Sequence, residues 1–391
     1  MKDRITIPVA IQIRLDDVAW HNGFDDRYCS RPSRTGIPRL HSALDYPIIH
    51  ELGKALDTQI TCAIVLGEWD KDNILRGEKY LTWDPEGWDR ASEMDMAYHQ
   101  SALEQLESSE YISYTIHGVL HGHYDNGLQV TEREFYARVK DPVTGEYTKE
   151  FTWFPDSEFR RHLDFFFKLY NTWGFQKPIH SFSCGNGNIG SQFDEGNIHY
   201  AEILKEYGVD IWPNGWTGMI GGTAAVVGGI VAMKSQPENV PWNAFDVDPD
   251  YLKPFNTESF RRTDIGLHWP NLLRWNPEKN MEYLPKWVNF FNRQTEVFGT
   301  MLSKDGYFAA SQAVYNRYAK LSFVENKCVI DLSDVDAQNA RALKQEFYIS
   351  FKNGVAPKGI TGGSIREYET KKEFKTYKVV RDGSDTVVIT L

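Results

Sequence analysis

Short apolar runs alternate with segments of helical periodicity over the first 302 residues of the chain. Apolar runs rich in β-branched and aromatic residues predict strands at 5–14, 59–66, 111–116, 178–184, 208–212 and 263–268. Between them, apolar residues that recur every three or four positions predict helices at 40–57, 93–108, 156–173, 196–207 and 283–302. Strands that alternate with helices indicate parallel βαβ units. At least six such units favour a barrel over an open sheet.

The pattern changes in two places. Residues 219–233 contain two glycine pairs among β-branched residues, which suits a hairpin better than a helix. From about residue 321, short strand-like runs are separated by Gly, Asn and Asp turns. We therefore expect an α/β barrel over residues 1–320 and a small antiparallel β-domain, sandwich-like, over residues 321–391.

Composition removes several classes of function. The chain has 391 residues, 54 of them acidic and 43 basic, and its net charge of −11 argues against nucleic acid as the main partner. The least polar stretch, 219–233, is too short to cross a bilayer, so no membrane association is expected. Residues 1–17 lack the pattern of a signal peptide, which predicts a cytoplasmic protein unless a leader has been removed. Four scattered cysteines predict free buried thiols: Cys29, Cys62, Cys184 and Cys328.

Polar residues follow the predicted strands repeatedly. In parallel α/β folds the carboxyl ends of the strands meet at one edge, where reactive side chains gather. The residues found there are Asp16 and Asp17, His117 and His121, Asn186, Asp210 and Trp212, and Leu267, His268 and Trp269. We therefore expect the functional site at this edge.

Two pairs among these residues suggest metal chemistry. His117 and His121 are four residues apart, so one helical turn would bring both imidazoles to one side as half of a divalent metal site. The adjacent carboxylates Asp16 and Asp17 would repel each other unless a cation or a proton separated their roles. One can bind the metal while the other acts as a general base.

These motifs, in this order, resemble the polysaccharide deacetylase (NodB-homology, carbohydrate esterase family 4) superfamily. The resemblance covers roughly residues 5–302 and implies a distorted (β/α) barrel, often with seven strands. It implies that Asp16 is the catalytic base, that His268 is the general acid, and that Leu267 lines the acyl pocket. It also implies a divalent metal ion, zinc above all, on Asp17, His117 and His121.

The chain departs from the family motifs at four points. The first motif reads Arg14-Leu15-Asp16-Asp17-Val18, without the usual leading aromatic or closing glycine. Gly118 follows the first histidine, where the family has Ser or Thr. The arginine that orients the base is missing from residues 183–186, and Asp210 with Trp212 only approximates the Asp-Trp element.

The resemblance implies a metal-dependent hydrolase that removes an acyl group, such as acetyl, from an aminosugar or an acylated carbohydrate. Aromatic and polar residues at the same edge are candidates for contacting the sugar: Trp20, Trp212, Trp269, Asp210 and Asn186. A glycosidase or C–N amidohydrolase on a related barrel is an alternative, and so is a carbohydrate-binding protein without catalysis. The sequence indicates neither the sugar nor the oligomeric state.

Overall fold

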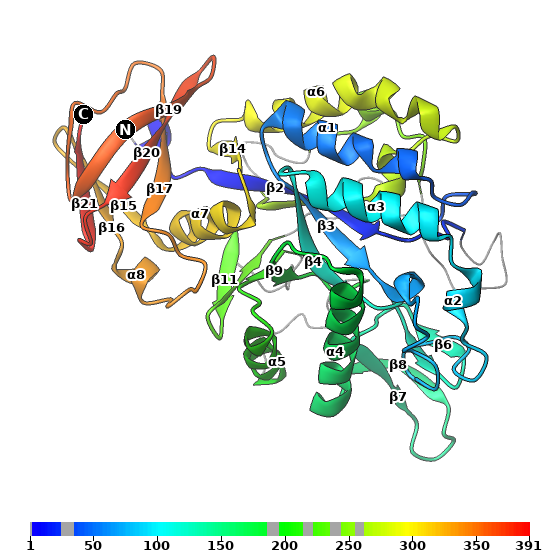
Figure 1. Ribbon diagram of the computed structural model, residues 1–391. Helices are drawn as coiled ribbons and strands as arrows, with labels where there is room; N and C mark the ends of the chain where they lie inside the picture. Colours follow the sequence, from blue (N-terminus) through cyan, green and yellow to red (C-terminus); the bar gives the residue numbers. More distant parts are fainter. Residues whose placement is uncertain (1, 25–34, 186–194, 214–221, 235–243, 255–261) are drawn as a thin grey trace.

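The computed structural model describes residues 2–24, 35–185, 195–213, 222–234, 244–254 and 262–391 (Figure 1). Its centre is a nine-stranded sheet in the order β11-β12-β10-β9-β4-β3-β2-β13, with β14 also paired to β2. The strands are β2 (Val9–Val18), β3 (Ile60–Val65), β4 (Ile112–Gly118), β9 (Ile179–Phe182), β10 (Ile211–Trp212), β11 (Ala224–Val227), β12 (Ile230–Met233), β13 (Asp264–His268) and β14 (Thr300–Leu302). Every pairing in this sheet is parallel except that of β11 with β12. The alternating pattern therefore predicted the mixed α/β class correctly.

The sheet curls into a half-barrel. Its end strands are β11 and β13, and no described strand pairs with both of them. The Lys234 carbonyl, one residue beyond β12, accepts hydrogen bonds from Thr263 N at 3.3 Å and Asp264 N at 3.4 Å, just where β13 begins. These two hydrogen bonds join the two sides of the half-barrel. Within the described residues, no ladder of strand pairing continues between β12 and β13.

Helices cover the sheet on its outer side. The helices are α1 (Pro47–Leu56), α2 (Arg90–Glu93), α3 (Met96–Ser108), α4 (Asp156–Trp173), α5 (Glu195–Glu206), α6 (Leu284–Thr295), α7 (Gly306–Tyr318) and α8 (Ser333–Asp336). In Figure 1, α1, α3 and α6 lie side by side over one part of the sheet, and α4 lies beside β4. Because helices and loops cover them, β2 and β3 are buried along their whole length.

Two predicted helices have different bounds in the structure. The helix expected at 40–57 begins only at Pro47, which occupies the first helical turn where its missing N–H costs nothing. The helix expected at 283–302 ends at Thr295, and Thr300–Leu302 forms strand β14 beside β2. Apolar periodicity did not predict this change, because β14 is defined by its partner strand.

The excursion between β4 and α4 holds two hairpins: β5 (His123–Asp125) with β6 (Leu128–Thr131), and β7 (Tyr136–Lys140) with β8 (Tyr147–Trp153). A further hairpin, β11–β12, turns through Gly228 and Gly229, both at positive φ, and this confirms the hairpin predicted over 219–233 in its described part.

The C-terminal residues form two four-stranded antiparallel sheets that share one apolar core. One sheet contains β15 (Lys320–Val324), β16 (Lys327–Asp331), β18 (Gly359–Thr361) and β21 (Thr386–Thr390). The other contains β17 (Glu346–Lys352), β19 (Gly363–Thr370), β20 (Phe374–Arg381) and β1 (Ile5–Thr6) from the start of the chain. Helix α7 contacts both β2 and β17, so it lies between the half-barrel and this β-sandwich.

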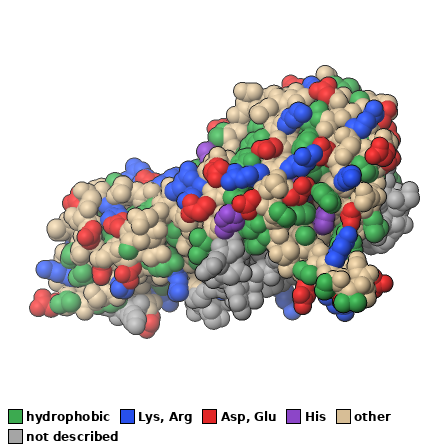
Figure 2. All heavy atoms as spheres, turned by 90° about the horizontal axis from the view of Figure 1, so that it is seen from below, with side chains coloured by type: hydrophobic (Ala, Val, Ile, Leu, Met, Phe, Trp, Pro, Cys, Tyr) green, Lys and Arg blue, Asp and Glu red, His purple; other side chains and the backbone are tan. Residues whose placement is uncertain are grey.

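The surface and the thiols agree with the composition. On the face drawn in Figure 2, acidic and basic side chains are interspersed over both lobes of the molecule. None of the described helices is both long enough and apolar enough to cross a membrane. Cys62, Cys184 and Cys328 are buried and form no disulfide within the described residues, as predicted, and Cys29 lies outside the described residues.

Candidate metal centre

An irregularity in β2 turns two neighbouring carboxylates toward one side. Successive side chains of a regular strand point to opposite faces, so Asp16 and Asp17 would normally diverge. The pairing of β2 with β3 slips between Leu15 and Val18, and Asp17 adopts a left-handed backbone with φ of 66°. Asp and Asn tolerate this conformation better than other residues with a side chain. As a result both carboxylates interact with His117.

Asp17, His117 and His121 converge on one point. Asp17 Oδ1 lies 3.3 Å from His117 Nε2 and 3.5 Å from His121 Nε2. Two ligands that each lie about 2.1 Å from one tetrahedrally coordinated zinc ion are about 3.4 Å apart, so these separations fit a shared ion. Asp17 and His117 are buried and His121 is partly exposed, which leaves one side of the group open. The group can therefore hold a metal ion.

His117 presents the correct nitrogen to this point. Its Nδ1 lies 2.5 Å from the Ser183 carbonyl, which can only accept, so Nδ1 carries the proton and Nε2 has a free lone pair. Nε2 is buried and has no hydrogen-bond partner within the described residues. A backbone carbonyl that fixes the tautomer in this way is the usual support for a metal-binding histidine.

A buried glutamate holds the loop between the two histidines. Glu134 accepts hydrogen bonds from Val119 N at 2.7 Å and Leu120 N at 3.0 Å, and it lies 3.1 Å from His162 Nδ1. Gly118 has φ of 142°, and a Cβ there would lie 2.3 Å from Glu134 Oε2. Glycine is therefore favoured at this position, because its backbone has positive φ and the glutamate occupies the space beside it.

The other end of this loop is also constrained. His121 adopts a left-handed backbone with φ of 48°. Gly185, beyond β9, lies so close that a Cβ there would be 2.5 Å from His121 Nε2. Two of the three candidate ligands, Asp17 and His121, thus have strained backbones, and such strain concentrates at functional sites.

Asp16 is held by an arginine from its own strand. Arg14 donates to Asp16 Oδ1 through Nη1, and to Asp264 Oδ2 through Nε at 3.2 Å and Nη2 at 3.1 Å. A Cβ at Gly266 would lie 2.5 Å from Arg14 Nη2, so glycine makes room for the guanidinium. Burial by itself would raise the pKa of Asp16, but Arg14, together with His117 and His268, outweighs it and holds that pKa below its ordinary value.

His268 and Leu267 lie beside this pair of carboxylates. Both residues are on β13, where His268 is the register partner of Asp16 and Leu267 that of Leu15. The electrostatic interaction with His268 is one of the causes of the lowered pKa values of Asp16 and Asp17, as expected for a residue in register with Asp16. Leu267 is buried, while His268 is partly exposed.

The tryptophans expected to contact a sugar are buried, and Asp210 lies at the other end of the sheet. Trp20, Trp212 and Trp269 are buried, at 1% exposure or less, so they have no free face for stacking. Trp269 instead stacks on His41, with ring centroids 3.9 Å apart. Asp210 precedes β10 at the amino end of the sheet, where it accepts from Tyr307 Oη at 2.5 Å and pairs with Arg341 Nε at 2.8 Å. Asn186 lies outside the described residues.

Three residues that support the candidate site do not belong to the predicted motif pairs: Arg14, Asp264 and Glu134. Arg14 carries a sequence signal, because a residue two positions before Asp16 shares its face of a strand. Asp264 and Glu134 carry none, since their roles depend on contacts across 250 and 15 residues of chain.

Comparisons of the chain with protein-family models, with curated proteins and with solved structures found no match.

Proposed function

We propose that this protein is a metal-dependent hydrolase that removes an acyl group, such as acetyl, from an aminosugar or an acylated carbohydrate. The observation that carries the proposal is the convergence of Asp17, His117 and His121 beside a second carboxylate, Asp16, which is itself held by Arg14. A metal site flanked by a separate base and acid is the arrangement that hydrolysis of an acyl group needs.

The proposal includes membership of the NodB-homology superfamily, with the half-barrel as its distorted (β/α) barrel. Two departures from the family motifs have structural replacements in this chain. Arg14 contacts the proposed base in place of the missing arginine, and Glu134 holds the histidine loop in place of a Ser or Thr side chain. These replacements support an active enzyme over a binding protein that has lost its catalytic groups.

Each residue has a distinct task in the proposed reaction. Asp17, His117 and His121 would hold a divalent ion, for which zinc fits the ligand set, and the bound ion would stabilise negative charge on the acyl oxygen. Asp16 takes a proton from the attacking water, and Arg14 keeps Asp16 charged and oriented for this step. His268 gives a proton to the departing nitrogen or oxygen of the sugar.

The glycosidase alternative is less well supported. It needs a second free carboxylate that faces Asp16 across the substrate. Of the carboxylates beside Asp16, Asp17 interacts with the two histidines and Asp264 is joined to Arg14. We therefore favour acyl removal.

The test is to measure metal content and acetate release on the same protein samples. We expect wild type to bind zinc and to release acetate from N-acetylglucosamine oligomers or from O-acetylated xylan. Asp16→Asn should retain the metal and lose about 10³-fold or more of the turnover. Asp336→Asn is the matched control, because it weakens a carboxylate–arginine pair in the β-sandwich.

Two outcomes would contradict the proposal. If Asp16→Asn kept most of the activity, Asp16 would not be the base. If metal-loaded wild type released no acetate from either substrate, the protein would act on another bond or would only bind carbohydrate.

A further inference from the structure

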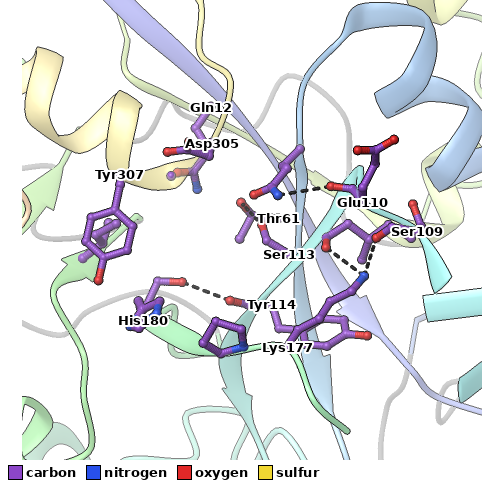
Figure 3. A pocket seen from close by; sticks show the side chains of 16 residues that line it. Gln12, Thr61, Ser109, Glu110, Ser113, Tyr114, Lys177, His180, Asp305 and Tyr307 are labelled. Atoms are coloured by element: carbon purple, nitrogen blue, oxygen red, sulfur yellow. Dashed lines mark hydrogen bonds between the residues drawn. The ribbon is translucent and has the colours of Figure 1, made fainter. Parts of the chain in front are cut away.

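A cavity lies at the opposite end of the half-barrel from the candidate metal centre. Its volume is about 430 Å³, and the beginnings of β3, β4, β9 and β10 surround it together with the first turn of α7 (Figure 3). Gln12 of β2 lines it. Gln12, Arg14 and Asp16 share one face of β2, so the cavity and Asp16 are separated by four residues, or about 13 Å along the strand.

Gln12 has an unusual environment. The residue is 1% exposed, and neither its amide nitrogen nor its amide oxygen has a hydrogen-bond partner within the described residues. Gln312 is equally buried at 1% exposure. Its nitrogen donates to the carbonyls of Pro8 and Tyr348, and its oxygen accepts from Tyr348 N. A buried amide normally makes hydrogen bonds, as Gln312 does. The described residues supply no such partner to Gln12, so we expect its partner to come from outside the chain.

The wall of the cavity carries polar groups on a largely apolar surface, and it includes the acidic residues Glu110 and Asp305. Hydroxyl groups line it from four residues: Thr61, Ser113, Ser181 and Tyr307. Lys177 is the basic residue of the wall, and its Nζ is already bound to the carbonyls of Leu106, Ser109 and Ile112. Ile112, Pro178 and Ile211 add apolar surface. With Glu110 and Asp305 in the wall and Lys177 already bound to carbonyls, the described lining disfavours an anion and suits a molecule with hydroxyl groups and an apolar face.

We propose that this cavity is a second binding site, for a neutral polyhydroxylated molecule about the size of one sugar ring. A hydroxyl group both donates and accepts, so it can satisfy the two halves of the Gln12 amide. The volume lies within the range of small-molecule pockets. The proposal is independent of the proposed hydrolase activity, because no residue of the metal centre lines the cavity.

The experiment titrates the full chain with D-glucose as the probe, by calorimetry and by the shift in thermal midpoint. We expect saturable binding at one site and a rise in the midpoint. The same binding should persist in His117→Gln, because that change affects only the metal centre. Loss of glucose binding in His117→Gln would mean that the sugar occupies the metal centre, and it would overturn the proposal.

Two glutamine variants form a matched pair. Gln12→Leu should weaken glucose binding at least tenfold without lowering the thermal midpoint of the free protein, because the amide it removes has no partner. Gln312→Leu should lower the midpoint of the free protein, yet keep the rise caused by glucose. Wild-type affinity for glucose in Gln12→Leu would overturn the proposal.

A third variant covers the possibility that Gln12→Leu does not fold. A Cβ at Gly306, in the first turn of α7, would lie 3.2 Å from Gln12 Oε1. Gly306→Ala therefore narrows the cavity beside the amide and should weaken glucose binding severalfold. If wild type showed no saturable binding and a crystal soaked in glucose held only ordered water in the cavity, the cavity would be a hydration site and the proposal would be wrong.

Discussion

The two ends of the central sheet differ in how their polar groups are satisfied. At the carboxyl end, charged groups pair with one another, and the chain adopts left-handed backbone at Asp17 and His121 to bring them together. At the amino end, apolar side chains and hydroxyl groups line a cavity together with Glu110, Asp305 and Lys177, and Gln12 has no amide partner among the described residues. Charged groups occur at both ends. At the carboxyl end they converge on the candidate metal centre, whereas at the amino end the buried group without a partner among the described residues is the neutral amide of Gln12.

A buried polar atom without a partner has a different environment at each end of the sheet. His117 Nε2 and the Gln12 amide both lack hydrogen bonds within the described residues. The histidine nitrogen lies 3.3 Å from a carboxylate, which is the setting for a cation. The amide lies among hydroxyl groups and apolar side chains, which is the setting for a neutral ligand.

The largest effect is expected at the metal ligands. Asp17→Asn preserves a residue that tolerates the left-handed backbone but removes the negative charge. We expect zinc affinity to fall by more than about 100-fold, beyond the usual effect of supporting residues. Equilibrium dialysis of zinc measures this. Asp141→Asn, in a turn far from the site in the sequence, is the control. An unchanged zinc affinity in Asp17→Asn would show that Asp17 is not a metal ligand.

The next effect concerns Arg14. Arg14→Gln leaves Asp16 and Asp264 buried without their cation, so we expect a loss of about 3–5 kcal/mol in the free energy of unfolding. Turnover by the folded fraction should also fall about 100-fold, because Asp16 loses its orientation. Arg381→Gln breaks an arginine–aspartate pair in the β-sandwich and should lower stability without changing turnover. Equal turnover in both variants would show that Arg14 has only a structural role.

A smaller effect is expected at Gly118. Gly118→Ala places a Cβ against Glu134, which holds the loop that carries His121, so zinc affinity should fall about 10–100-fold. Gly145 also has positive φ, 73°, but its Cβ would have nothing within 4 Å. Gly145→Ala therefore measures backbone strain alone and should leave zinc affinity unchanged. The two variants are compared by zinc titration.

The smallest effect is an acid-dependent loss of stability at His99 of α3. Burial lowers the pKa of His99 from 6.5 to about 4. The unfolded chain therefore takes up a proton near pH 6.5 while the folded protein does not, so stability falls as pH falls below 6.5. Between pH 6.5 and 5.5 this costs about 1 kcal/mol. His99→Gln should remove that part of the slope in urea unfolding at the two pH values, and an unchanged slope would show that His99 does not cause it.

The sequence by itself determined the class of fold and the half of the site that lies at strand ends. Runs of apolar residues located the strands that became β2, β3, β4, β9 and β13, because such a run is a local property of a segment. The pairs Asp16–Asp17 and His117–His121 could also be found from the sequence, because the two members of each pair lie close together in the chain beside a predicted strand.

Only the tertiary structure decided which distant groups complete the site. Asp264 reaches Asp16 through Arg14 from the neighbouring strand, and Glu134 supports the His121 loop from beyond a hairpin. The tryptophans Trp20, Trp212 and Trp269 became core rather than surface, although their sequence positions suggested a sugar-binding rim. The cavity beside Gln12 was equally invisible, because empty space depends on how side chains from separate segments pack. Contacts across the chain, and not local pattern, assign these roles.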